Sequence, residues 1–143
     1  MLDKVKITTA LDYASGTADR TGAILDMQGF AGVLIIVKFA TIAAEAVTSV
    51  KAQQGAAANM SDAADLAGTA IAVADDDDNQ VFVIDVEHPT ERYIRLFVDK
   101  DATNAAAESA IYLRYGPDYK PVVNTVANAV TSEAHVLPVE GTA

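Results

Sequence analysis

Short apolar runs with alternating polar positions dominate the chain, and loop-forming residues separate them. In residues 80–86, for example, Phe82, Ile84 and Val86 alternate with residues that would point the other way. A period of two in stretches rich in β-branched and aromatic residues is typical of β-strands, and Gly, Asp, Asn and Pro between the runs are typical of turns. The predicted strands are residues 4–8, 23–27, 32–40, 46–53, 69–74, 80–86, 92–99 and 108–115.

The spacing of these strands predicts the fold class. Turn signals at intervals of about 8–12 residues are typical of an all-β sandwich or barrel, and no long amphipathic helix separates the strands. We therefore expect an all-β, jelly-roll-like two-sheet β-sandwich. Residues 32–40 are the most apolar and should form a central strand buried on both faces. We expect a polar loop at 12–22 and the only helix, a short one, within 55–66, capped by Asn59 or Ser61.

The last 27 residues of the chain are predicted to lie outside the sandwich. We expect residues 1–116 to form the sandwich domain and residues 117–143 to form an extended C-terminal arm. This arm has too many apolar residues for a disordered tail, so it should pack on its own domain or on a neighbouring subunit. One further strand at 125–131 is consistent with its sequence.

The composition of the chain disfavours some partners and excludes some kinds of catalysis. The 143 residues carry a formal net charge of −10 and include no cysteine. The excess of acid disfavours nucleic acid and anionic membrane surfaces as partners, and the lack of cysteine excludes thiol catalysis and zinc–thiolate sites. The longest apolar run, 33–37, is too short to span a bilayer, and the N-terminus does not read as a signal peptide.

Candidate catalytic and metal-binding residues are few. Residues 75–79 begin like a calcium-binding loop, but Gln80 and Val86 stand where the pattern needs Gly and Glu. A solvated turn is the better interpretation, and whether it binds any cation stays open. His88 and His135 have no nucleophile or partner in a known motif. We therefore predict no enzyme activity, no cofactor and no metal site.

Six stretches of the chain, taken in order, form an overall pattern rather than a chemical motif. They are ASGTADRTG (14–22), LDMQGF (25–30), VKAQQ (50–54), DAADLAGT (62–69), PTERYIR (89–95) and PVEGTA (138–143). In this pattern the chain resembles the small head decoration, or cement, proteins of tailed bacteriophages.

The resemblance implies a jelly-roll-like sandwich bound to the outside of an icosahedral capsid, where it bridges major capsid subunits and stabilises the shell. The implied partners are the major capsid protein and other copies of the chain, with a homodimer favoured over a trimer. The implied location is the capsid exterior of a virion assembled in the host cytoplasm.

The loop at 12–22 and the arm are the expected contact regions, because an extended segment can add contacts to a partner surface. The candidate interaction residues are Asp12, Tyr13, Arg20, Val122, Val123, Val126, Val130, Val136 and Leu137. Removing residues 120–143 should then weaken assembly and leave much of the sandwich folded. Two alternatives remain: a sugar-binding surface module of a virion, relying on Tyr93 or Tyr112, and another phage head or tail subunit.

Overall fold

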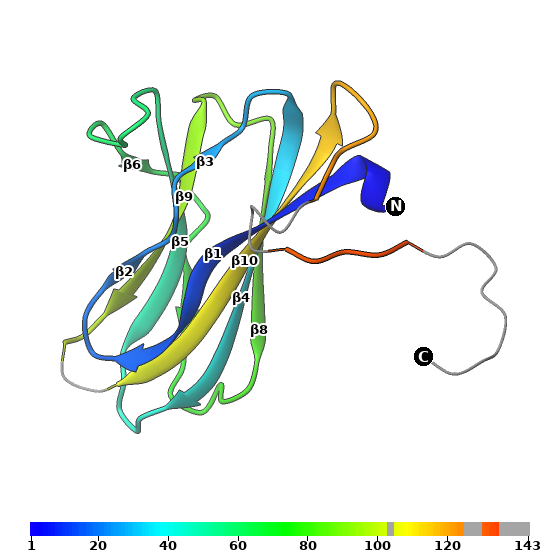
Figure 1. The fold of residues 1–143 in the computed structure, drawn as a ribbon. Coiled ribbons are helices and arrows are strands. Elements are labelled where there is room, and N and C mark those ends of the chain that lie inside the picture. Colours follow the sequence, from blue (N-terminus) through cyan, green and yellow to red (C-terminus); the bar gives the residue numbers. More distant parts are fainter. Residues whose placement is uncertain (103–104, 125–129, 135–143) are drawn as a thin grey trace, which may run out of the picture.

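A computed structural model describes residues 1–102, 105–124 and 130–134 and shows two packed antiparallel β-sheets (Figure 1). A single turn of 3₁₀-helix, η1 (Leu2–Lys4), precedes the strands. The strands in these residues are β1 (Val5–Gly16), β2 (Arg20–Thr21), β3 (Leu25–Asp26), β4 (Phe30–Ile42), β5 (Thr48–Gly55), β6 (Ala64–Asp65), β7 (Ile71–Val73), β8 (Val81–Glu87), β9 (Tyr93–Lys100) and β10 (Ala106–Pro117).

The strand order is that of a jelly roll. Sheet A has the order β1-β10-β4-β8. In sheet B, β9 and β5 are central, β2 and β3 both pair with the outer side of β9, and β6 and β7 both pair with β5. If each of these short pairs is taken as one interrupted edge strand, every sheet has four positions and the chain crosses between the sheets as in two Greek keys. The predicted jelly-roll-like two-sheet sandwich is confirmed.

The core lies between the sheets and follows the alternation in the sequence. Ile94, Leu96 and Val98 of β9 face the inner residues of β4, and all of them are fully buried. Tyr112 of β10 crosses the core, and its hydroxyl accepts a hydrogen bond of 2.8 Å from the backbone N–H of Leu96. This N–H lies opposite the gap between β2 and β3, where Gly22 stands. Glycine leaves room for the hydroxyl at this point, because a Cβ on residue 22 would lie 2.4 Å from the Tyr112 oxygen. Tyr112 therefore joins the two sheets.

Residues 12–22 are not a loop, and that prediction was wrong. Strand β1 continues to Gly16 opposite β10, and β2 begins at Arg20. The pairing of β1 shifts register between Thr9 and Leu11 and again between Leu11 and Ala14, as β-bulges do. An edge strand with bulges has polar residues out of period, so its sequence resembles a loop.

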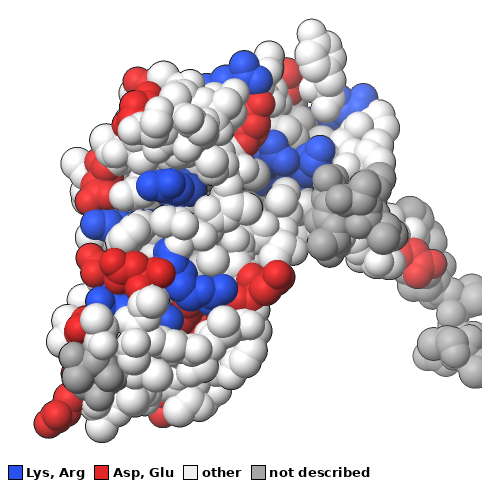
Figure 2. Space-filling model, turned by 60° about the vertical axis from the view of Figure 1, so that its left-hand side comes forward, with Lys and Arg blue, Asp and Glu red and all other residues white. Residues whose placement is uncertain are grey.

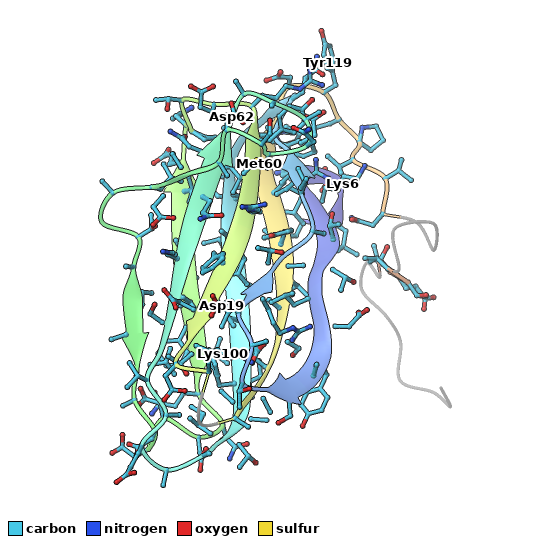
Figure 3. All side chains as sticks on the ribbon, turned by 90° about the vertical axis from the view of Figure 1, so that its left-hand side faces the viewer. Lys6, Asp19, Met60, Asp62, Lys100 and Tyr119 are labelled. Carbon is cyan, nitrogen blue, oxygen red and sulfur yellow. The ribbon has the colours of Figure 1, made fainter. Side chains whose placement is uncertain are left out.

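The short helix expected within 55–66 is also absent. The Asp62 carboxylate, labelled in Figure 3, instead accepts hydrogen bonds from the N–H groups of Ala56 and Ala57. The Asn59 side chain accepts one from the N–H of Ser61. These bonds close tight turns, with Met60 buried beneath them at φ 54°. Asn, Asp and Ser can cap a helix, but they also stabilise such turns, and here the turns form.

Strand β4 is interior to sheet A, as expected, but it is buried on one face only. Its inner residues have no exposed surface, whereas Leu34 and Ile36 are half-buried and Lys38 is exposed. Of the further strand suggested at 125–131, residues 125–129 lie outside the described residues, and 130–131 have no regular structure. No helix long and apolar enough to cross a membrane occurs in the part of the chain that the structure describes.

Candidate interaction surface

The outer face of sheet A carries an apolar surface that runs across its four strands. In the register of the sheet, Thr9, Ile111, Ile36 and Val83 form one row. Residues opposite each other in a sheet point to the same face. We define the apolar face as the outward residues of this row and its neighbours, namely Ile7, Leu34, Ile36, Val81, Val83, Ile111 and Leu113.

Several of these side chains are open to solvent. Val81 is 55% exposed, Val83 is 48% exposed and Ile111 is 41% exposed. At one end of the face the Tyr115 hydroxyl donates a 2.7 Å hydrogen bond to Asp85, and burial raises the pKa of Tyr115 to about 12. A contiguous apolar surface with a polar boundary is typical of a site that binds another surface.

A groove deepens the apolar face at the edge strand β1. We call it the edge groove; it encloses about 350 Å³. Tyr13, which is 68% exposed, lies within the second register shift of β1, and the groove extends from this strand across β10 to β4. Its lining includes Thr9, Leu11, Tyr13, Ile36, Lys38 and Ile111.

The outer face of sheet B has a different character. Lys51 pairs with Asp65 at 2.8 Å and lies 5.0 Å from the ring centre of Phe97. Gln53 donates to Asp65 and accepts from Arg95, so these polar groups bond to one another. Figure 2 shows acidic and basic side chains next to one another on the face it presents. The Lys51 ammonium lowers the pKa of Asp65 by hydrogen bonding.

The first part of the C-terminal arm lies along the edge strand β1. The N–H of Val122 donates to the Asp3 carbonyl at 3.0 Å. The Asn124 side chain accepts from the Ile7 N–H at 2.8 Å and donates to the Val5 carbonyl at 3.0 Å. The arm is therefore held on the same strand, β1, that lines the edge groove.

The structure places the predicted contact residues of β1 and β2 in different surroundings. Asp12 and Tyr13 are exposed, and Tyr13 lines the edge groove. Arg20 instead turns inward, where it pairs with Glu108 at 2.9 Å and donates to the Asp12 carbonyl at 2.8 Å. Its guanidinium is therefore held within the molecule.

Arg20 belongs to a buried ionic cluster that the sequence did not reveal; Figure 3 labels one of its members, Lys100. The side chains of Glu108 and Lys100 are fully buried and pair at 2.8 Å. Lys100 also donates to the carbonyls of Gly16 and Ala106, and its own N–H donates to Asp19. Glu108 comes from sheet A and Lys100 from sheet B, so the cluster links the sheets. In the sequence, these charged residues look like ordinary strand ends.

The predicted contact residues of the arm are only partly described. Val122 is half-buried, Val123 is 61% exposed and Val130 is half-buried. Val126, Val136 and Leu137 lie outside the described residues. The apolar face itself was not among the predicted sites, although the outward apolar residues at 34, 36, 81 and 83 could have indicated it.

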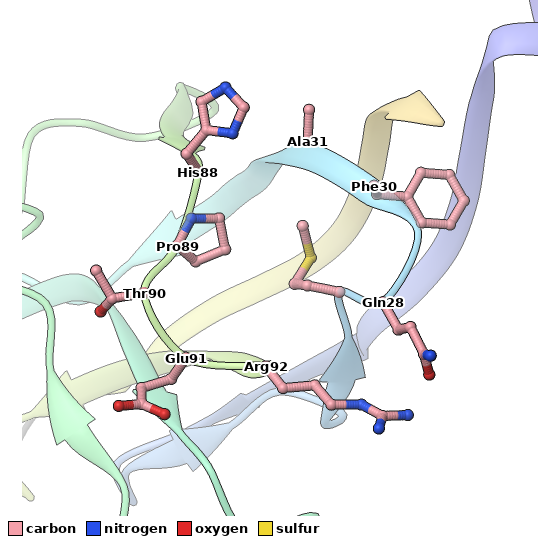
Figure 4. A pocket seen from close by; sticks show the side chains of 9 residues that line it. Gln28, Phe30, Ala31, His88, Pro89, Thr90, Glu91 and Arg92 are labelled. Carbon is pink, nitrogen blue, oxygen red and sulfur yellow. The ribbon is translucent and has the colours of Figure 1, made fainter. Parts of the chain in front are cut away.

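A second hollow, of about 410 Å³, lies at the other end of the sandwich beside the turn at 88–92 (Figure 4). Pro89 stands between His88 and Arg92 along its wall. The Arg92 guanidinium forms two hydrogen bonds to Asp26, at 2.9 and 2.7 Å, and thereby lowers the pKa of that carboxyl. His88 is exposed. The charged groups at this hollow are therefore paired or directed to solvent.

The acidic turn at 75–79 has a structural use. Asp75 accepts from the N–H of Glu45, Asp78 from that of Ile42, and Asp77 from that of Ala74. These carboxylates fix the turns between strands. Among the residues that the structure describes, no group of three or more His, Asp or Glu side chains is placed to hold a metal ion.

The two tyrosines named for sugar stacking differ in exposure. Tyr112 is fully buried, and its burial raises its pKa. Tyr93 is half-buried, with the Arg92 guanidinium 5.3 Å from its ring centre.

Comparison with protein-family models and with curated proteins finds no match to this chain.

Proposed function

We propose that this protein is a structural virion protein that binds the outside of an icosahedral phage capsid and stabilises it by bridging major capsid subunits. The observation that carries the proposal is the exposed apolar face of sheet A. On the outer face of sheet B, by contrast, polar side chains bond to one another. Three exposed aliphatic side chains across one rigid sheet suit a contact surface, because burying each would contribute about 1–2 kcal/mol.

Two further features support this function. Jelly rolls with two Greek keys are common in viral capsid proteins, although this is support by analogy of fold alone. The C-terminal arm leaves the domain along an edge strand, which gives the molecule a second means of contact. Many copies on one shell would also bind with avidity, so each contact need only be modest.

The proposed location is the capsid exterior, with the major capsid protein as partner. Sheet A would face the shell, because its outer side loses little hydration when it is covered. Sheet B would face solvent, where its ion pairs remain hydrated and the net charge of −10 keeps neighbouring particles apart.

The test is co-sedimentation of the purified full-length protein with expanded empty shells of the major capsid protein. The wild type should bind, and Val81→Lys with Val83→Lys should weaken binding at least about tenfold because two ammonium groups would be buried. Val47→Lys is the matched control, since Val47 is 71% exposed and lies in the turn before β5. Equal binding by all three proteins, or no binding by the wild type, would contradict the proposal.

Electron microscopy of the decorated particles separates this function from that of another head or tail subunit. A shell protein should occur in many copies distributed over the surface. A neck or tail component would instead be confined to one vertex or to the tail.

A further inference from the structure

Strand β8 forms one edge of sheet A and has no second partner strand among the residues that the structure describes (Figure 1). It pairs with β4 alone, through seven consecutive residues and without a register shift. A long, regular edge of this kind presents a row of unpaired N–H and C=O groups, to which another extended chain can bond.

The backbone groups that point outward belong to every second residue of β8. The Phe39 N–H of β4 donates to the Gln80 carbonyl at 3.0 Å, and at the other end the His88 N–H donates to the Ala31 carbonyl at 2.8 Å. Because bonding alternates along an antiparallel ladder, the even-numbered residues of β8 bond to β4 and the odd-numbered residues direct N–H and C=O away from it. We call these the outward set: Val81, Val83, Asp85 and Glu87. Within the described part of the chain, no residue bonds to their backbone groups.

The other three sheet edges in the described chain are blocked or short. On β1, the opposite edge of sheet A, the Asn124 side chain accepts from the Ile7 N–H and donates to the Val5 carbonyl, and two register shifts follow. The edges of sheet B are β2 with β3 and β6 with β7, which are two or three residues long. Bulges, short strands and covered ends are common means of preventing a strand from adding to an edge. Of the devices that protect an edge, β8 has only acidic side chains at one end.

The side chains along β8 indicate what kind of strand would fit. Val81 and Val83 are exposed and belong to the apolar face. Asp85 and Glu87 follow at the other end of the strand, also exposed and on the same face. Neighbours on one face of a sheet contact each other directly, and opposite charges stabilise such pairs whereas like charges destabilise them. The matching strand therefore has apolar residues beside the valines and a basic residue beside the carboxylates.

We propose that an extended segment of the major capsid protein, with this side-chain pattern, adds to β8 as a fifth strand of sheet A. It bonds to the backbone groups of the outward set and continues the apolar face, which is a known mode of recognition at sheet edges. The inference rests on the proposed function and deepens it, because it names the edge that binds and the chemistry of the bound segment.

Two other occupants fit less well. A second copy has a net charge of −10 and brings the same acidic edge, so it lacks the basic residue that Asp85 and Glu87 call for. The C-terminal arm of the chain itself is fixed by Asn124 to the opposite edge of the sheet. In the order β1-β10-β4-β8, three strand spacings of about 4.8 Å place that edge about 14 Å from β8.

Hydrogen exchange of the wild-type full-length protein tests the added strand directly. The protein is exchanged free and bound to expanded empty shells, and its amides are read by NMR after release from the shells. In the free protein the N–H groups of Phe82, Ile84 and Val86 should be protected by β4, and those of the outward set should exchange rapidly. On the shell, the outward set should slow at least about tenfold, because its N–H groups become bonded.

A proline substitution tests the same bonds through binding. Val83→Pro removes one outward N–H and keeps an apolar side chain, and an edge strand tolerates proline where its N–H points away from the sheet. Val83→Ala is the matched control, because it shortens the same side chain and keeps the N–H. In co-sedimentation with shells, the proline variant should bind at least about tenfold more weakly than the alanine variant. The exchange measurement uses the wild type, so the test does not depend on the folding of Val83→Pro.

The basic residue of the partner is tested by reversing one charge on the edge. Glu87→Lys should weaken shell binding, because two like charges would then face each other across the added strands. Glu91→Lys changes the net charge equally at an exposed position in the turn after β8 and should bind like the wild type. Equal binding by these two variants would contradict a basic residue beside Glu87.

Shell binding with equal affinities for Val83→Pro and Val83→Ala, or with an outward set that still exchanges rapidly, would overturn the inference and leave the proposed function standing. Protection of the outward set without shells would also overturn it. If that protection were independent of concentration, the chain itself would cover the edge; if it rose with concentration, a second copy would. A wild type that does not bind shells would remove the proposed function and this inference together.

Discussion

The outer faces of the two sheets both consist of every second residue of their strands, but one face is polar and the other is apolar. On sheet B, outward polar residues such as Lys51, Gln53 and Asp65 bond to one another across strands. On sheet A the equivalent outward positions include Ile36 and Ile111, whose side chains have no polar group to pair and are partly exposed. A polar face whose groups already satisfy one another gains little from a partner, whereas an exposed apolar face does.

The difference between the faces indicates where contact should occur in a molecule of this kind. Both faces belong to one rigid sandwich, so neither needs to rearrange before binding. The difference arises from which side chains stand at outward positions. Breaking the interactions that hold the two sheets together should therefore lower the free energy of unfolding more than changing a side chain on either face.

The largest effect should come from breaking the buried ionic cluster that holds both faces in place. Glu108→Gln would leave the buried Lys100 ammonium without its counter-charge. Removing one partner of a buried ion pair typically costs about 3–5 kcal/mol of unfolding free energy. Urea denaturation should show this loss with an unchanged m-value. Glu87→Gln, at a carboxylate whose side chain is 70% exposed, is the control and should leave the midpoint nearly unmoved.

A smaller loss should follow from removing the hydroxyl that joins the sheets. Tyr112→Phe leaves the buried N–H of Leu96 without its acceptor and should cost about 1–3 kcal/mol. Gly22→Ala should destabilise the wild type, because the new Cβ would lie 2.4 Å from that hydroxyl oxygen.

A double-mutant cycle sharpens this point. Gly22→Ala should do less harm in the Tyr112→Phe background, with a coupling of about 0.5–3 kcal/mol, because the clashing oxygen is gone. Strictly additive effects would mean that the hydroxyl does not define the space at Gly22. The remaining approach to Leu96 Cβ, at 3.1 Å, should keep Gly22→Ala from becoming neutral.

The faces themselves should respond differently to substitution. Val83→Lys on sheet A should change the unfolding free energy by less than about 0.5 kcal/mol, since exposed positions tolerate substitution, but it should weaken shell binding. Gln53→Ala on sheet B removes bonds to Asp65 and Arg95 and should lower thermal stability slightly without affecting shell binding. If Gln53→Ala weakened shell binding and Val83→Lys did not, sheet B would be the binding face and the comparison would be wrong.

The smallest expected effect is the pH dependence contributed by one carboxylate of sheet B, Asp65. Hydrogen bonding to Lys51 lowers the pKa of Asp65 in the folded state below its usual 3.8. The stabilisation is therefore present above pH 3.8 and is lost as pH falls through the lower folded-state pKa. Thermal melts between neutral and strongly acidic pH should show a slightly smaller acid-induced fall for Asp65→Asn than for the wild type.

Much of the fold could be predicted from sequence because alternation is a local signal. Residues 80–86 and 92–99 point their side chains as the period of two indicates. The edge strand β1 could not be recognised beyond its first residues, because its bulges break that period. The turns at 56–62 resemble a short helix in sequence because Asn, Ser and Asp stabilise both structures.

The candidate site was less predictable than the fold. Tyr13, one of the predicted contact residues, is exposed and lines the edge groove, and its role in contact stays a prediction. The apolar face was only partly predictable: its outward apolar residues are visible within single strands, but Ile36, Val83 and Ile111 come from three strands that lie far apart in the sequence. Their grouping depends on the pairing register, which sequence patterns leave open. Arg20 is among the predicted contact residues, but it pairs with Glu108, which lies 88 residues away in the sequence.

The central claim is that the outer face of sheet A lies against the capsid. The most direct measurement is an electron cryomicroscopy reconstruction of shells saturated with the full-length protein, at a resolution that distinguishes the two sheets. The expected map has Val81 and Val83 buried against the major capsid protein and has Lys51 and Asp65 facing solvent. A map with sheet B on the shell and Val83 open to solvent would contradict the claim.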